Sequence, residues 1–312
     1  MNFKEIYPED REKKVEEQLR KVWKGEIPVT YSCIAHPTYR QVEDDEEYVR
    51  LAVEHILENG KYPGYNPPRL ITDFGTVSTA SYWGGKIHLP EFGCKYIDPI
   101  IHNEKEAREA FPLDRKGDVE KALELYTKVC RKLGADHLYS TTIDFQGPLN
   151  TAALLWEQSD FMTAMYDEPE AVHEFLDKVT DYLIRTIKKL QRGLQGKTCG
   201  NVWPYIWLPS DLGIGITEDY MPLLSADTYR EFGIPYVERI SKEFGGLFIH
   251  CCGEYEHQIR NLRDSDINIR GLEFHYPHTR PEVLFEAFGD EVLFVPYLAP
   301  RGEEEFKTRY EY

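Results

Sequence analysis

The sequence contains no apolar stretch that approaches the roughly 20 residues needed for a membrane-spanning helix. Its N-terminus, residues 1–17, is densely charged and lacks the apolar segment of a secretory signal. Six cysteines in 312 residues show no repeating framework, so they do not indicate a disulfide scaffold. Together these absences predict a cytoplasmic protein with reduced thiols.

Positive charge is also scarce. Lys and Arg total 37 against 54 Asp and Glu, which gives a formal net charge of -17. A nucleic-acid binder needs clustered cations for phosphate contacts, and adsorption to an anionic membrane needs them too. The composition argues against both classes, and most of the acidity is explained by solubility.

The 41% of hydrophobic residues is enough for a substantial core, and elements of two kinds alternate along the chain. Strands are predicted at 27–33, 69–74, 137–144, 202–207, 245–250, 268–274 and 291–297, and helices at 9–24, 46–58, 118–133, 150–166, 169–192, 226–244, 254–262 and 281–288. Such alternation is typical of parallel βαβ units. No Gly-x-Gly-x-x-Gly follows the first strand, which disfavours a dinucleotide-binding fold.

We therefore predict an α/β fold, a single (β/α)8 TIM barrel over residues 1–312 with an N-terminal helical extension of about 25 residues. Only seven strands are recognised. We expect the C-terminal strand and helix to be missing from this chain.

Chemistry in such a barrel sits where strands end. The candidates at these positions are Asp73, Asp144, Trp203, Trp207, His250, Cys252, Glu273, His275 and Tyr297. His250 and Cys252 stand out because residues i and i+2 point to the same side and offer an imidazole nitrogen and a thiolate to one zinc ion. Gly253 lets the chain turn sharply after them. The alternative is that His250 ends a strand and Cys252 is a small core residue.

Glu273 ends the next predicted strand and is a candidate third zinc ligand or catalytic group; alternatively it pairs with Arg270 or Arg280. Asp73 is a candidate for holding a substrate amine or accepting a proton, and Asp144 for binding substrate. Both aspartates fit an Asx-turn or helix cap equally well. The aromatic residues Trp203, Trp207 and Tyr297 are candidate substrate contacts, although such residues more often belong to the core.

Several motifs resemble the uroporphyrinogen decarboxylase superfamily, which includes corrinoid-dependent methyltransferases of the methylcobamide:coenzyme M type. The similarity extends from about residue 69 onward. The stretches that carry it are Gln146-Gly-Pro-Leu-Asn150, Leu154-Leu-Trp-Glu157, Met165-Tyr-Asp-Glu-Pro-Glu-Ala-Val-His173, Leu224-Ser-Ala-Asp-Thr-Tyr-Arg-Glu-Phe232 and Phe248-Ile-His-Cys-Cys-Gly253.

The resemblance favours the methyltransferase branch. The decarboxylases carry a Met-Arg-Gln-Ala-Gly-Arg segment for the acidic tetrapyrrole, whereas residues 28–40 here lack most of that positive charge. The methyltransferases carry His-x-Cys, matched by His250 and Cys252, and a distant second cysteine that has no counterpart in this chain. A glutamate linked to their metal is matched by Glu273.

The resemblance implies a zinc-dependent enzyme that moves a methyl group between a small molecule and a corrinoid (methylcobamide) carried by a partner protein. Zinc would lower the pKa of a bound thiol so that it attacks a methyl group on cobalt. Coenzyme M, tetrahydrofolate, methylamines and methoxylated aromatics all remain open as methyl donors or acceptors. Two alternatives remain: a metal-free decarboxylase with Asp73 as the central carboxylate, and a catalytically degenerate binding protein.

Overall fold

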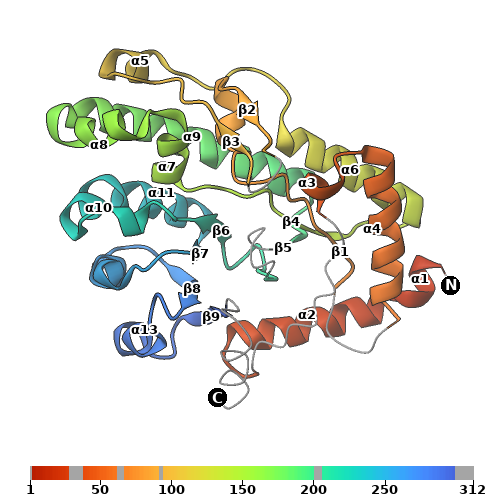
Figure 1. Cartoon of the computed structure of the whole chain (residues 1–312). Coiled ribbons are helices and arrows are strands. Elements are labelled where there is room, and N and C mark those ends of the chain that lie inside the picture. The colour runs from red at the N-terminus through yellow and green to blue at the C-terminus, as the bar shows by residue number, and fades with distance from the viewer. Residues whose placement is uncertain (1, 28–37, 62–66, 91–93, 200–205, 299–312) are drawn as a thin grey trace.

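The computed structural model describes residues 2–27, 38–61, 67–90, 94–199 and 206–298. Seven parallel strands lie in two sheets, with helices on their outer side (Figure 1). The first sheet has the order β1 (Arg69–Leu70), β4 (Tyr139–Thr141), β5 (Thr198–Cys199). The second has the order β6 (Ile214–Thr217), β7 (Leu247–Cys251), β8 (Ile269–Tyr276), β9 (Leu293–Leu298). A separate antiparallel pair joins β2 (Ile87–His88) and β3 (Tyr96–Ile97).

Helices connect the parallel strands and bury their apolar faces against them. The longer ones are α2 (Glu9–Trp23), α4 (Asp45–Asn59), α6 (Asp118–Leu133), α9 (Pro169–Gly193) and α11 (Ile234–Phe244). The shorter ones are α1 (Phe3–Ile6), α3 (Tyr39–Val42), α5 (Glu104–Glu109), α7 (Pro148–Leu155), α8 (Gln158–Asp167), α10 (Ala226–Phe232), α12 (Ile259–Asp264) and α13 (Pro281–Phe288), with 3-10 turns at η1 (Ala80–Trp83), η2 (Met221–Leu223) and η3 (Glu256–Gln258). None of the described helices is long and apolar enough to cross a membrane.

The two sheets meet where the segment after β4 passes the end of β6. A parallel bridge pairs Gln146 with Thr217, and the Gly147 amide donates to the Thr217 carbonyl over 2.8 Å. The predicted α/β architecture with parallel strands is confirmed. A closed eight-stranded barrel is not formed by the part of the chain that the structure describes.

The strand predictions need two corrections. β6 was not predicted, because its four residues are all buried and show no alternation of apolar and polar side chains. β5, two residues long, ends at Cys199, and Ile206 and Trp207, the two described residues of the strand predicted at 202–207, are not in a strand. Residues 200–205, and nearly all of the strand predicted at 27–33, lie outside the described residues.

Two predicted helices are each split in two. The one at 150–166 becomes α7 and α8, separated at Trp156, with the Glu157 carboxylate capping α8. The one at 226–244 becomes α10 and α11, because Pro235 cannot donate a backbone hydrogen bond and therefore starts a new helix after Gly233.

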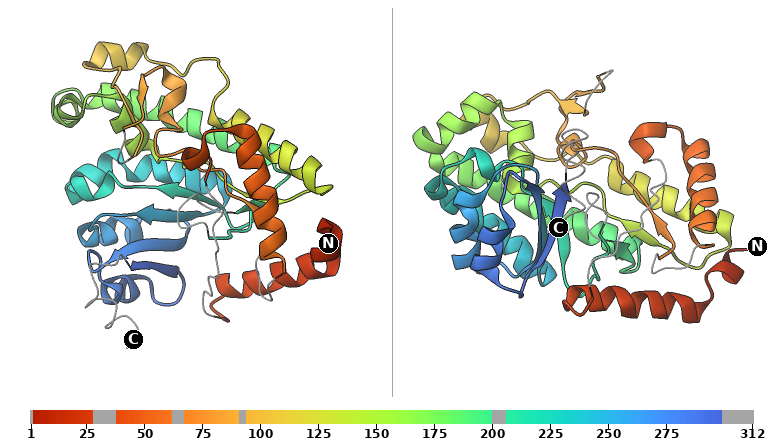
Figure 2. Two further views of the ribbon diagram at one scale, coloured as in Figure 1. Left: turned by 45° about the vertical axis from the view of Figure 1, so that its right-hand side comes forward. Right: turned by 60° about the horizontal axis from the view of Figure 1, so that its bottom comes forward.

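Helix α2 crosses the ends of the sheets at which their strands begin (Figure 2). The ring of Trp23 lies edge-on to Phe248 of β7, with centroids 6.1 Å apart, and packs beside Tyr139 of β4. This N-terminal helix therefore contacts both sheets at one end, and the opposite, carboxyl ends carry the polar side chains described next.

Candidate metal and active site

The register of the second sheet brings the candidate residues together. Thr217 of β6 is paired with His250 of β7, and His250 with Glu273 of β8. Two residues beyond Glu273 on β8, His275 is paired with Tyr297 of β9. Because neighbours in a parallel register point to the same face, these side chains meet at the carboxyl edge of the sheet.

The imidazole of His250 lies between two carboxylates. Its Nδ1 makes a direct hydrogen bond with Glu273 Oε2, and its Nε2 lies 3.7 Å from Asp219 Oδ1. Burial lowers the pKa of His250 to about 4, so the ring is neutral at pH 7. A neutral imidazole that donates from Nδ1 presents the lone pair of Nε2, which is the form that binds metals.

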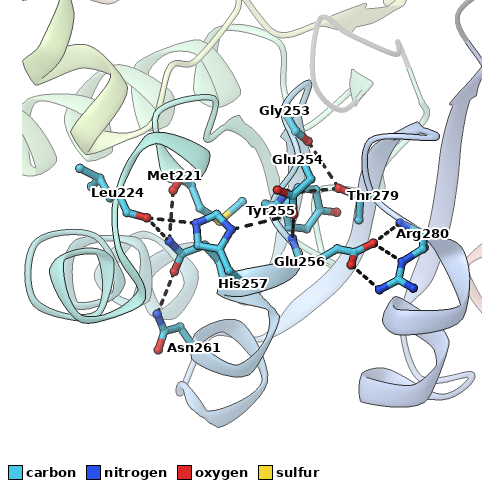
Figure 3. A network of polar contacts seen from close by, with 11 residues as sticks. Met221, Leu224, Gly253, Glu254, Tyr255, Glu256, His257, Asn261, Thr279 and Arg280 are labelled. Atoms are coloured by element: carbon cyan, nitrogen blue, oxygen red, sulfur yellow. Dashed lines mark hydrogen bonds and ion pairs between the residues drawn. The ribbon is translucent and has the colours of Figure 1, made fainter.

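Cys252 is the first residue after β7. The loop that follows it, from Gly253 to His257, is fixed from both sides (Figure 3). On one side, Thr279 Oγ1 accepts from the Tyr255 amide over 3.3 Å and donates to the Gly253 carbonyl over 3.4 Å. On the other, the side chains of His257 and Gln258 bond the Leu224 carbonyl. These contacts hold the loop that directly follows Cys252.

Asp219, two residues beyond β6, was not among the predicted site residues. Its Oδ1 accepts from the Cys252 amide over 2.7 Å. Ligand atoms of Asp219, His250 and Cys252 lie within 4.8 Å of one another. A sequence signal existed, because Asp219 would stand at a strand end if 214–217 had been recognised as a strand.

A second group shares His250. Ligand atoms of His250, Glu273 and His275 also lie within 4.8 Å of one another. His275 Nε2 is 3.5 Å from Glu273 Oε1, and neither buried atom has a hydrogen-bond partner among the described residues. The structure thus brings the three predicted ligands to one edge but divides them, with Cys252 in the first group and Glu273 in the second.

The predicted residue Tyr297 lies beside His275. Their ring centroids are 4.4 Å apart with an angle of 34° between the planes. The rings of His275 and His250 approach edge-on at 5.9 Å. Tyr297 therefore borders the second group of ligands, at the position predicted for a substrate contact.

Asp73 and Asp144 follow the strands of the first sheet. Asp73 is buried, and its Oδ1 accepts from the Gly75 amide over 2.8 Å, the local turn predicted as the alternative. Asp144 accepts hydrogen bonds from Thr217 Oγ1 over 3.0 Å and from Gln146 Nε2 over 2.9 Å. Burial, with the negative charges of Asp73 and Asp219 adding to it, raises the pKa of Asp144 to about 7.

The pKa of the Cys252 thiol is raised, as is that of Asp144. Loss of surrounding water and the neighbouring Asp219 carboxylate raise the pKa of this thiol to about 12, even though the residue as a whole is exposed. Burial is the main cause of the raised pKa of both Asp144 and Cys252, and the Asp219 carboxylate contributes to each.

Glu218, next to Asp219, is fully buried at the junction of the sheets. Tyr229 donates to its Oε2 over 3.2 Å, and its Oε1 has no hydrogen-bond partner among the described residues. Burial raises the pKa of Glu218 to about 8. A Cβ atom on Gly147 would stand 1.6 Å from this Oε1, so a larger residue there would force the Glu218 side chain to move.

Trp207 does not lie at this edge. Its ring packs against Tyr139 at 6.2 Å, near the start of β4, and its carbonyl accepts from Trp23 of α2 over 2.6 Å. Predicted to contact substrate at the strand ends, Trp207 instead packs at the opposite end of the sheets and is not itself in a strand. Trp203, the other predicted tryptophan, lies outside the described residues.

Comparison with known proteins agrees with this arrangement. Residues 65–194 match the model of the family described as uroporphyrinogen decarboxylase (URO-D). The resemblance to the uroporphyrinogen decarboxylase superfamily that the motifs predicted is thereby confirmed over these residues. No curated protein sequence matches it significantly.

Among solved structures, the chain is similar to a "methyltransferase from Methanosarcina mazei". The TM-score is 0.68 at 16% sequence identity, and the match covers 92% of this chain and 84% of the other. At this identity the likeness concerns the fold, which is shared over nearly the whole length.

Proposed function

We propose that this protein is a zinc-dependent methyltransferase that moves a methyl group between a small molecule and the corrinoid of a partner protein. The observation that carries the proposal is the convergence of His250 and Cys252 at the carboxyl edge of the second sheet, with their ligand atoms within 4.8 Å of each other. The likeness to a solved methyltransferase and the sequence motifs support it. We further propose that the strands complete a (β/α)8 barrel around this edge.

The donor atoms suit zinc. A neutral imidazole, a thiolate and a carboxylate oxygen form a borderline-soft set with bonds of about 2.0–2.3 Å. A bound zinc ion would supply a Lewis acid that stabilises a thiolate at neutral pH. His250 and Cys252 would hold it, and the hydrogen bond from Nδ1 to Glu273 keeps the imidazole in the tautomer that can bind.

Methyl transfer is a displacement in which the methyl group moves without its bonding electrons. When the acceptor attacks a methylated corrinoid, a bond forms between acceptor and carbon, the cobalt–carbon bond breaks, and cobalt keeps the electron pair. The acceptor must therefore give up its proton. Asp73 is proposed to bind the small molecule or accept that proton, with Asp144 and Tyr297 as further substrate contacts.

The carboxylates gathered at this edge oppose a tetrapyrrole decarboxylase. Asp73 and Asp219 contribute to the raised pKa of Asp144, so another group of carboxylates entering here meets like charge. A neutral or cationic methylated compound meets no such penalty.

Metal analysis of the purified protein tests the proposal. The wild-type protein and a Cys94→Ala control, which loses an exposed thiol elsewhere, are expected to hold stoichiometric zinc. His250→Ala and Cys252→Ala are expected to hold little or none. Full zinc occupancy in both site variants would overturn the proposal.

A further inference from the structure

A cavity of about 550 Å³ lies between the connections that lead into β8 and β9. It is bordered by the last turns of α12 and α13 and by the residues at the start of β8 and just before β9. β8, β9 and α13 lie together at one side of the molecule (Figure 1). This β8–β9 cavity is at the amino ends of the strands, opposite to His250 and Glu273. Its volume is in the range of roughly 300–1,000 Å³ that is typical of small-molecule sites.

Arg270, which lines the cavity, stands at a break in the strand register. The pairing of β7 with β8 skips this one residue, so Arg270 is the extra residue of a β-bulge, a feature that redirects a side chain. Among the described residues, its guanidinium donates to the backbone carbonyls of Leu212 and Gly245, each over 3.3 Å. Both acceptors are uncharged, and a guanidinium has more N–H groups than these two bonds use. Arg270 therefore has the charge and the donors to bind an anion.

The other charged side chains of the cavity differ in their partners. The guanidinium of Arg263 is neutralised by Asp264, whose Oδ1 lies 2.9 Å from Nε and 2.8 Å from Nη2. Glu291 lines the cavity and makes no ion pair within the part of the chain that the structure describes. Because β8 and β9 are neighbours in the sheet, Arg270 and Glu291 approach the cavity from adjacent strand starts. The cavity therefore has one cation and one anion that do not pair with each other.

Apolar side chains complete the lining. Leu262, Ile267 and Val292 are buried, and Phe288 is half-buried. A ligand with a short apolar part would lose contact with water against these side chains, which favours binding.

From these observations we propose that the β8–β9 cavity binds a small zwitterion with a short apolar part, its carboxylate at Arg270 and its ammonium group at Glu291. A ligand with a single charge leaves one of the two side chains unpaired. A polyanion meets Glu291 and the net charge of -17. The inference goes beyond the proposed methyl transfer and does not depend on it, because none of the candidate residues at the carboxyl edge lines this cavity.

Calorimetric titration of the purified protein with matched probes tests the proposal. L-leucine and 6-aminohexanoate carry both charges, at short and at long separation. The analogues 4-methylpentanoate and hexanoate lack the ammonium group, and 3-methylbutylamine and pentylamine lack the carboxylate. At least one zwitterion is expected to bind one-to-one and more tightly than both of its single-charge analogues. Inorganic phosphate is expected not to displace it.

Substitutions separate the contributions of the two charges. Arg270→Gln should weaken binding of the zwitterion by about tenfold or more, because hydrogen bonds between charged groups are strong. Glu291→Gln should weaken it by roughly two- to fivefold, since Glu291 is exposed, and should leave binding of the carboxylate analogue unchanged. Arg260→Gln removes an exposed cation of α12 that does not line the cavity, and should stay within about twofold of wild type.

Two further variants test the location of the ligand. Ala287→Phe fills the cavity from α13 without touching either charge, so it should remove binding. It keeps the proposal testable if Arg270→Gln does not fold. His250→Ala changes the carboxyl edge alone and should bind the zwitterion like wild type.

The outcomes separate as follows. Tighter binding of a zwitterion that is lost in Ala287→Phe and kept in His250→Ala supports the site. Binding lost in His250→Ala but kept in Ala287→Phe places the ligand at the carboxyl edge and overturns the inference, while the proposed methyl transfer stands. Equal binding of each zwitterion and its carboxylate analogue overturns it, as does the absence of binding at millimolar concentrations.

Discussion

The two parallel sheets carry polar side chains at the same edge but hold them differently. In the first sheet, Asp73 and Asp144 accept hydrogen bonds from a nearby amide, a hydroxyl and a side-chain amide. In the second, His250 has one nitrogen fixed by Glu273 and the other directed at Asp219. Carboxylates that already accept hydrogen bonds from the protein suit substrate contacts. Donor atoms that converge, with lone pairs not used in hydrogen bonds, suit a metal ion.

Strand pairing explains the difference. In the second sheet the register continues through His250, Glu273 and His275, so these residues are fixed by backbone hydrogen bonds. In the first sheet Asp73 and Asp144 lie three residues beyond the last paired residues of β1 and β4 and depend on side-chain contacts. The comparison predicts that metal binding depends on the second sheet and substrate handling on the first.

The largest expected effect tests that division. His250→Ala and Cys252→Ala should lose more than about 100-fold in zinc affinity, since each removes a ligand. Asp73→Asn should bind zinc within a few-fold of wild type while losing methyl transfer. Titration of each variant with zinc against a chelating dye measures the affinity. A comparable loss of zinc affinity in Asp73→Asn would contradict the assignment of metal binding to the second sheet alone.

The junction of the sheets should be the next most sensitive place. Gly147→Ala puts a Cβ atom against Glu218 Oε1, so we expect a loss of about 1–3 kcal/mol in the free energy of unfolding, the usual cost of overpacking. Denaturant unfolding of the metal-free protein measures it. Adding Glu218→Ala should recover part of the loss, and a double variant no better than the sum of the single variants would contradict this account of the contact.

A smaller effect is predicted for the pH dependence of stability. The pKa of Asp144 is about 7 in the folded protein and near 3.8 when unfolded, so between these values the folded state holds a proton that the unfolded state releases. The free energy of unfolding therefore falls as pH rises from 4 to 7, by at most about 1.4 kcal/mol per pH unit from this group. Above pH 7 the contribution is constant.

Asp144→Asn should lack this slope. Unfolding of metal-free wild type and variant at several pH values between 4 and 8 should show the variant gaining stability relative to wild type as pH rises to 7. A difference that stays constant over the whole range would show that Asp144 titrates normally.

The smallest effect is expected at Trp207, which packs at the other end of the sheets. Trp207→Phe should leave zinc affinity within about twofold of wild type and reduce stability by on the order of 1 kcal/mol through lost packing. A large change in methyl transfer with unchanged folding would restore Trp207 as a substrate contact.

Much of the fold was predictable because its signals are local. Helices α2, α6 and α13 have apolar periodicity and clear ends, and their predicted bounds differ from the observed ones by at most one residue. Strand β7 was recognised with its His250 end for the same reason. The resemblance to the uroporphyrinogen decarboxylase superfamily followed from motifs such as Gln146-Gly-Pro-Leu-Asn150, and residues 65–194 match that family's model.

The features that were not predicted depend on how segments distant in the sequence pair or pack with one another. β6 reads Ile-Gly-Ile-Thr, too short and too uniformly buried to show a period, and missing it also meant missing Asp219. Glu273 was predicted on the correct strand, but the nitrogen of His250 that it faces is set by the pairing of β7 with β8. Trp207 is not itself in a strand, and its packing with Tyr139 and Trp23 joins segments far apart in the chain, which no local pattern indicates.

Methyl transfer itself is tested most directly with methylcobalamin as a free stand-in for the partner's corrinoid. Zinc-loaded wild-type protein, given a panel of small acceptors that includes coenzyme M, should convert the methylcobalamin spectrum to that of the demethylated cofactor and yield the methylated acceptor. Cys252→Ala should do neither. An unchanged spectrum with every acceptor, together with turnover of uroporphyrinogen by the same preparation, would contradict the account.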